Sequence, residues 1–285
     1  MKILKRYPSI QATHTIRSRR IYSADEVDSK GNSDDVSPEV EKAFNQLVDK
    51  LQDESFEDLG DALDDIVNDP KLYALLSEGF GDGALADVKM SSNAEAIPVT
   101  KLLPCQSEIG LDNSLSYPLK QDCSKLFQGT VQIVAPIVTY ETMFVIDGHH
   151  RWSQLYMMNP NAKISAINFN YEVDSPWVAL RNFQGAIAVA NKDVPKQYSK
   201  VNNVFDMSES EIADYVDKNI QDVCWKSLVK VGVCEDRDSA IDYIVDNVMR
   251  LKKKNYPFPG APDREFMPQT DEKAIKIAQE GQTNI

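Results

Sequence analysis

The sequence predicts an α+β fold, in which a small mixed α/β domain is flanked on both sides by helical segments. Short β-prone apolar runs are confined to the middle of the chain, roughly residues 97–171. Before and after them, apolar residues recur at the spacing of amphipathic helices. The 285 residues suffice for one large domain or two modest ones. We expect a tail over 1–36, an acidic helical subdomain over 37–94, the α/β domain over 95–175 and a helical region over 176–285.

The first 36 residues have the composition of a flexible tail. The first 20 residues carry six Lys and Arg and no acidic residue, and the polar run 29–35 favours a linker. Such a tail can dock a protein partner, contact nucleic acid locally, or remain solvated, and an Arg-rich, acid-poor opening also fits an organelle transit peptide. The whole chain has a net charge of −13. It is therefore a poor candidate for nonspecific duplex binding, which depends on basic side chains that neutralise phosphates.

An acidic helical subdomain is predicted next. Between residues 21 and 90, 19 Asp and Glu are offset by only five Lys. Ser37-Pro38 suits a helix start, and a second helix is predicted to stop at Asp69-Pro70. A short third piece ends at the glycine-rich run 79–83. We expect these helices to pack on the core, and they are also a candidate surface for a protein partner. The apolar residues of the second helix are Leu59, Leu63, Ile66 and Val67.

Four strands are predicted in the middle of the chain. The first lies within 97–104, and two more, over 131–138 and 143–146, are joined by a hairpin turn at 139–142. A helix follows the third strand, and residues 164–171 alternate with the period of two that a strand requires. Strand, strand, helix and strand within about 80 residues form a compact α/β unit.

The C-terminal third is expected to be mostly helical. Ser208 and Glu211 have capping-box spacing, which predicts the start of a helix. A second helix is predicted from about Asp238 to a basic end, where lysines complement the helix dipole. Three prolines between 257 and 262 then impose an extended segment before a short last helix near 272–279.

Several function classes are excluded by composition. No stretch approaches the ~20 apolar residues that span a bilayer, and the start of the chain has no apolar signal-peptide core. We therefore expect no contact with a membrane. The four cysteines form no CxxC pair, and none has a nearby histidine at zinc-ligand spacing. They are predicted to be reduced thiols in a cytoplasmic compartment.

The run Asp-Gly-His-His-Arg-Trp at 147–152 carries most of the chemical information. It follows a β-prone run and precedes a helix-forming one, which predicts a strand, a tight glycine turn and a helix. That geometry aims the first free N–H groups of the helix, with His and Arg side chains, at a point that suits a phosphate. Metal ligation by Asp147, His149 and His150 is the alternative. It is disfavoured because the histidines lack the i,i+4 spacing of common zinc sites.

This pattern resembles the ParB/sulfiredoxin-like superfamily, in particular members whose nucleotide loop reads DGHHR, such as free serine kinases and ParB-like nucleases. A second element is similar: the run from Ile97-Pro98 to Leu103-Pro104, followed by Gln106 and Glu108, looks like the opening strand and loop of that fold. The resemblance covers roughly residues 95–172.

The resemblance implies a nucleotide site that takes ATP, ADP or CTP with Mg²⁺. Gly148 would permit close backbone approach, while Arg151 and the histidines would donate to phosphate oxygens. Glu108 would act as general base or orient metal-bound water, and Ser114 would contact phosphate through its hydroxyl. The implied catalytic residues are Glu108, His149 and His150. The implied phosphate cradle is Asp147, Gly148, His149, His150 and Arg151.

Two relatives with different chemistry fit the sequence less well. Sulfiredoxins carry a catalytic Cys where this chain has His149, and partition ParB proteins have a more arginine-rich loop followed by a helix-turn-helix. We therefore predict phosphotransfer, nucleotide hydrolysis, or hydrolysis of a phosphodiester as in a nuclease. The alternative is a non-catalytic phage assembly or virion-associated protein with a vestigial nucleotide site, in which the tail and the acidic segment bind partners.

Overall fold

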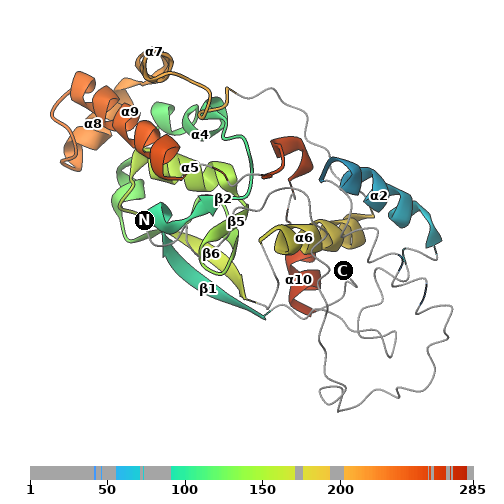
Figure 1. The fold of residues 1–285 in the computed structure, drawn as a ribbon. Coiled ribbons are helices and arrows are strands. Elements are labelled where there is room, and N and C mark those ends of the chain that lie inside the picture. The colour runs from blue at the N-terminus through green and yellow to red at the C-terminus, as the bar shows by residue number, and fades with distance from the viewer. Residues whose placement is uncertain are drawn as a thin grey trace.

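The computed structural model describes residues 56–70, 91–170, 176–192, 202–255, 260–267 and 272–280, with Lys42, Gln46, Tyr73, Pro257 and Thr270. Among them a mixed six-stranded sheet lies between two groups of helices, which confirms the predicted α+β fold (Figure 1). The predicted tail and the third acidic helix, Tyr73 apart, fall outside the described residues, and so does the first helix except for Lys42 and Gln46.

The strands are β1 (Ser91–Pro98), β2 (Leu103–Pro104), β3 (Thr130–Val131), β4 (Ile137–Tyr140), β5 (Phe144–Asp147) and β6 (Lys163–Asn170). The α-helices are α2 (Phe56–Asn68), α4 (Leu111–Leu115), α5 (His149–Met158), α6 (Pro176–Asn191), α7 (Glu209–Asn219), α8 (Asp222–Lys230), α9 (Arg237–Lys254) and α10 (Glu272–Glu280). Short 3-10 helices are η3 (Val99–Lys101), η4 (Pro118–Lys120), η5 (Ser124–Phe127) and η6 (Arg264–Phe266).

The strand order is β1-β6-β4-β5-β2, and β3 also pairs with β6. β1 runs antiparallel to β6 over its whole length, from Ser91 opposite Asn170 to Pro98 opposite Lys163. β4 and β5 form the predicted hairpin, although Thr139 and Tyr140, predicted as part of its turn, continue β4. β4 is parallel to β6, and β2 is parallel to β5. Because β1 begins at Ser91, the sheet extends across the boundary predicted between residues 94 and 95.

The single strand predicted over 131–138 is wrong, since two short strands replace it. β3 ends at Val131 and β4 begins at Ile137, and both pair in parallel with β6. Between them the chain loops outward: Val134 has φ 63° and is 94% exposed. Pro136, which has no N–H to donate to a ladder, stands just before the second strand.

The two faces of the sheet are covered by different helices. Residues of β5 alternate between them: Val145 packs with α5 and α9, while Phe144 and Ile146 pack with α6. Figure 1 shows α4, α5 and α7–α9 gathered on one side, with α6 and α10 on the other. The parallel pairs within the sheet require such covering on both faces.

Several helix predictions are confirmed. α7 begins with the capping box of Ser208 and Glu211, α9 ends at the predicted basic turn, and α10 occupies the last predicted helix. α6 and α8 were not predicted individually. The predicted second acidic helix is α2, and its buried face packs on α6 and α10 through Leu59, Leu63, Ile66, Ala188, Val189 and Ile277.

In the part of the chain that the structure describes, no helix combines the length and apolar character needed to cross a membrane.

Candidate functional site

The strand, glycine turn and helix predicted at residues 147–152 are confirmed. β5 ends at Asp147, Gly148 adopts the left-handed conformation at φ 93° and ψ 26°, and α5 starts at His149. No side chain caps this helix end. A Cβ on Gly148 would lie 2.6 Å from Ile137 Cγ2 and 2.9 Å from Arg151 Nη2. In this structure it is therefore side chains of the protein that approach the glycine closely.

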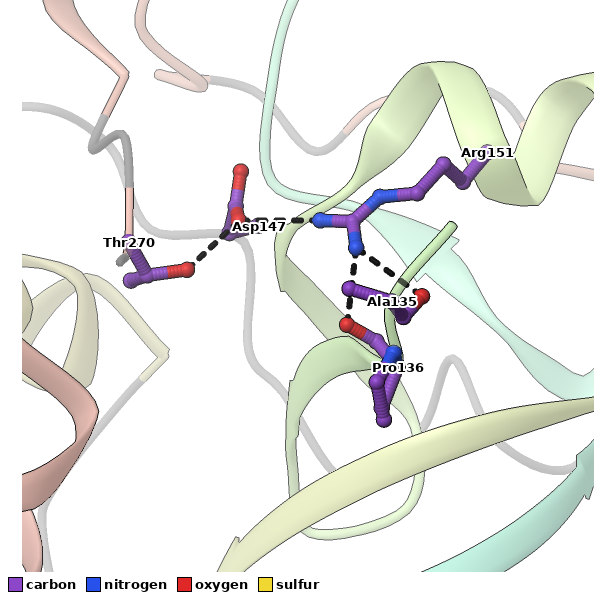
Figure 2. Close-up of polar contacts among 5 residues, drawn as sticks. All are labelled: Ala135, Pro136, Asp147, Arg151 and Thr270. Atoms are coloured by element: carbon purple, nitrogen blue, oxygen red, sulfur yellow. Dashed lines mark hydrogen bonds and ion pairs between the residues drawn. The ribbon is translucent and has the colours of Figure 1, made fainter. Parts of the chain in front are cut away.

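The guanidinium of Arg151 joins the turn to the loop between β3 and β4. Its Nη1 donates to the carbonyl oxygens of Ala135 at 3.0 Å and Pro136 at 2.8 Å, and its Nη2 lies 3.1 Å from Asp147 Oδ2 (Figure 2). Both accepting carbonyls belong to the outward loop between β3 and β4. The guanidinium, predicted to bind phosphate, is thus held in this structure by three groups of the protein.

Asp147 is the centre of a partly buried polar cluster. Its Oδ2 accepts from Arg151 and also from Thr270 Oγ1, at 2.5 Å (Figure 2). Burial raises the pKa of this carboxyl, although the hydrogen bond from Thr270 and the charge of Arg151 act in the opposite direction. The cluster joins residues 123 positions apart in the sequence.

His149 connects the turn to the loop after β2. The side chain is 4% exposed, and its Nε2 accepts the backbone N–H of Cys105 at 3.1 Å. Burial, assisted by the charges of His150 and Arg151, lowers the pKa of His149 to about 3. A hydrogen bond with the backbone of Val145 acts the other way. This neutral imidazole positions the loop, and a catalytic role for it stays a prediction.

His150 points to a different part of the structure from His149, as expected for neighbouring residues of a helix. Its Nε2 is buried and has no hydrogen-bond partner among the described residues. Burial, and then the charge of Arg264, lower the pKa of His150 to about 4. The backbone N–H of Arg264 donates to Glu108 Oε2 at 3.4 Å. Two of the predicted catalytic residues, His150 and Glu108, therefore both interact with Arg264 in this structure.

Ser114 lies inside the protein rather than at this surface. It is fully buried, its hydroxyl donates to Gly110 O at 2.8 Å, and it lies 2.7 Å from Ser153 Oγ. The hydroxyl pair joins α4 to α5. The predicted contact of Ser114 with phosphate stays untested, and in this structure the hydroxyl is occupied by protein groups.

A covering segment, residues 260–267 and Thr270, lies against the loop that carries Glu108. Ser107 N–H donates to Pro262 O at 2.9 Å, and Ser107 Oγ donates to Asp263 Oδ1. Gln184 of α6 holds the same segment through a hydrogen bond to Phe266 O. The prolines between residues 257 and 262 predicted an extended segment. No signal in the sequence predicted that this segment, with Arg264, lies at the site.

Direct metal ligation finds no support among the described residues, since no group of three or more His, Cys, Asp or Glu side chains is arranged to hold a metal ion. Asp147 and His149 are instead engaged by Arg151, Thr270 and Cys105.

Comparison of the chain with models of protein families, with curated proteins and with solved structures gives no match. The resemblance to the ParB/sulfiredoxin-like superfamily therefore rests on the two sequence elements at 97–108 and 147–152, and it stays a prediction.

Proposed function

We propose that the protein binds a nucleoside di- or triphosphate at the amino end of α5. The carrying observation is the set of groups at that end: a helix start without a side-chain cap, and beside it the buried, unpartnered Nε2 of His150. The positively charged guanidinium of Arg264 interacts electrostatically with the same imidazole. Free N–H groups and the helix dipole favour an anion, and a guanidinium favours phosphate oxygens.

The structure supports roles for the charged residues that differ from the roles that the motif implies. Arg151 is engaged by Ala135, Pro136 and Asp147, and Arg264 supplies a second positive charge for the ligand beside His150. Asp147 and Arg151 then shape the turn. His150 is neutral near pH 7, and its Nε2 can bind a phosphate oxygen when it carries the proton.

The reaction in this proposal is phosphotransfer or hydrolysis of the bound phosphate. Glu108 is half-buried and adjacent to Arg264, and it would accept a proton from the attacking hydroxyl or water. Mg²⁺ would be held chiefly by phosphate oxygens and water, because it seldom relies on an all-protein cage. Glu108 would orient one of those waters. A cytoplasmic location belongs to the same proposal, since all four cysteines are free.

The test is a thermal-shift titration with ATP, ADP, CTP and GTP, with and without Mg²⁺. A ligand that binds only the folded state stabilises it by about 2.7 kcal/mol at a hundredfold excess over its Kd. We expect a shift in Tm with at least one nucleotide, and we expect Arg264→Gln to reduce it. Arg237→Gln is the matched control, because Arg237 pairs with Asp217 on the surface of α7 and α9.

A well-folded protein that shows no shift with any nucleotide would overturn the proposal. An unchanged shift in Arg264→Gln would reject the assigned site. Arg151→Ala is unsuitable as the sole test, since it would remove three contacts that hold the turn.

One observation favours a second function. The polar groups of Asp147, His149, Arg151 and Ser114 all have partners within the protein. This is the condition expected if the turn is purely structural and the protein acts by binding partners, as in virion assembly. The same titration separates the two functions, because this one predicts no nucleotide-dependent shift.

A further inference from the structure

Two cysteines that are distant in sequence meet in the interior. Cys123 Sγ lies 3.6 Å from Cys224 Sγ, across a separation of 101 residues. Both side chains are buried. Cys123 lies immediately before η5, on the loop that follows η4, and Cys224 lies in the first turn of α8.

The backbones around this pair are held in register by hydrogen bonds. Cys123 N–H donates to Ser227 Oγ at 2.9 Å, and the same hydroxyl donates to Cys224 O at 2.6 Å. At the start of α8, Gln221 N–H donates to Leu119 O at 2.9 Å. The two sulfurs therefore meet because two chain segments are fixed to each other on either side of them.

We propose that Cys123 and Cys224 are a site of oxidation, at which an intramolecular disulfide joins the sheet domain to the helices α7–α9. A disulfide has a bond length of about 2.05 Å, so each sulfur needs to move by less than about 1 Å. The bond closes a segment that contains β3–β6 and the helices α5, α6 and α7.

The oxidant in this proposal is a hydroperoxide. One thiolate attacks the terminal peroxide oxygen, so that an S–O bond forms, the O–O bond breaks and the alkoxide or hydroxide leaves with the thiol proton. The second sulfur then attacks the sulfenic sulfur, the S–S bond forms, and hydroxide leaves as water with the second proton. Two thiols are oxidised by two electrons, and one peroxide is reduced.

Access and reactivity depend on local opening. The hydrogen bond with Cys123, together with burial, raises the pKa of the Cys224 thiol. The Cys123 side is built from short 3-10 helices, whose hydrogen bonds are poorer than those of an α-helix. It is the side that opens to admit a small peroxide. Such a bond would be transient in a reducing compartment, as cytosolic disulfides usually are.

The distribution of lysine and arginine makes the test direct, because trypsin places each cysteine on a separate peptide. These peptides are 102–120 (Cys105), 121–125 (Cys123), 219–226 (Cys224) and 231–237 (Cys234). The full chain is treated with graded hydrogen peroxide, its remaining thiols are alkylated, and the digest is analysed by mass spectrometry without reduction. We expect peptide 121–125 linked to 219–226, and we expect dithiothreitol to reverse the link.

The variants separate this pair from the other thiols. Cys123→Ala and Cys224→Ala should each abolish the linked peptide, whereas Cys105→Ala should retain it, because Cys105 is buried in the other hydrophobic cluster, against α6. The digest of the unmodified protein tests for the disulfide even if one variant fails to fold. A link between 219–226 and 231–237 would overturn the proposal. So would full alkylation of Cys123 and Cys224 at peroxide concentrations that oxidise the partly exposed Cys234.

Discussion

Gly148 is the residue on which the turn depends most directly. Its φ of 93° disfavours any side chain, and a Cβ would also collide with Ile137 and Arg151. We expect Gly148→Ala to destabilise the protein by about 2–5 kcal/mol, the sum of backbone strain and overpacking. Urea unfolding followed by circular dichroism measures the change.

Gly232 provides the matched control for that substitution. It has φ 79°, but nothing lies within 4 Å of the position that a Cβ would occupy. Gly232→Ala should therefore cost only the strain, about 1–2 kcal/mol. Equal losses in the two variants would show that the contacts with Ile137 and Arg151 contribute little.

His149 and His150 make stability depend on pH in a defined direction. An unfolded histidine titrates near 6.5, whereas burial lowers the pKa of His149 to about 3 and of His150 to about 4 in the folded protein. Between these values the unfolded state binds protons that the folded state does not. The stability present above pH 6.5 is therefore lost as the pH falls, by about 1.4 kcal/mol per pH unit for each histidine.

His149→Gln tests this dependence. The glutamine Oε1 can replace Nε2 as the acceptor for Cys105 N–H, but it does not titrate. Urea unfolding at several pH values between 7.5 and 5 should show a slope reduced by about one proton relative to the unmodified chain. A slope that the substitution leaves unaltered would contradict the assigned burial of His149.

At these residues the sequence predicted the backbone better than the side-chain contacts. A strand followed by Gly148 and a helix is a local pattern, which adjacent residues determine. Arg151 looked like a phosphate ligand because the motif contains no information about Ala135 and Pro136. Those carbonyls become available only because the predicted strand breaks there, and that break depends on pairing with β6.

Among the elements, the covering segment is held to the end of β5 through Thr270. Thr270 Oγ1 donates to the partly buried Asp147 carboxylate, and its loss would leave that oxygen with less compensation for burial. We expect Thr270→Val to cost about 1–3 kcal/mol and to speed hydrogen exchange in residues 147–151. Exchange measured by mass spectrometry reports both effects.

Thr130→Val is the control for the covering segment, because Thr130 is exposed in β3. Its effect should stay within about 0.5 kcal/mol. Faster exchange at residues 147–151 in the control variant, or none in Thr270→Val, would show that the hydrogen bond does not hold the segment.

Elements with strong local signals were predictable, and those defined by distant partners were not. The capping box at Ser208 and Glu211 located α7 because each residue satisfies the other's backbone group. η6 has no comparable signal. Its position follows from hydrogen bonds to Ser107 and Gln184, which are 156 and 82 residues away from their respective partners.

At the scale of the whole molecule, α2 is joined to the sheet through α6. Leu63 is fully buried where α2 meets α6 and α10. We expect Leu63→Ala to cost about 2–5 kcal/mol and to lower the midpoints of far-UV circular dichroism and tryptophan fluorescence together. Val67→Ala, at a partly buried position of the same helix, should cost less.

Separate midpoints for the two probes would contradict this coupling. They would indicate that α2 unfolds independently, contrary to the expectation from the sequence that the acidic helices over 37–94 pack on the core. The negative charge of that segment is evident from the sequence. Its attachment to α6 was not predictable in detail, because it depends on packing against Ala188 and Val189.

The covering segment also has a consequence during synthesis. Thr270 leaves the ribosome 123 residues after Asp147, which at about 5–20 residues per second is roughly 6–25 s later. Throughout that interval the strand, the glycine turn and α5 can form, while Asp147 still lacks its hydroxyl donor and Glu108 still lacks Arg264. The nascent chain therefore passes through a period in which this end of α5 is open to solvent and to any small anion in the cell.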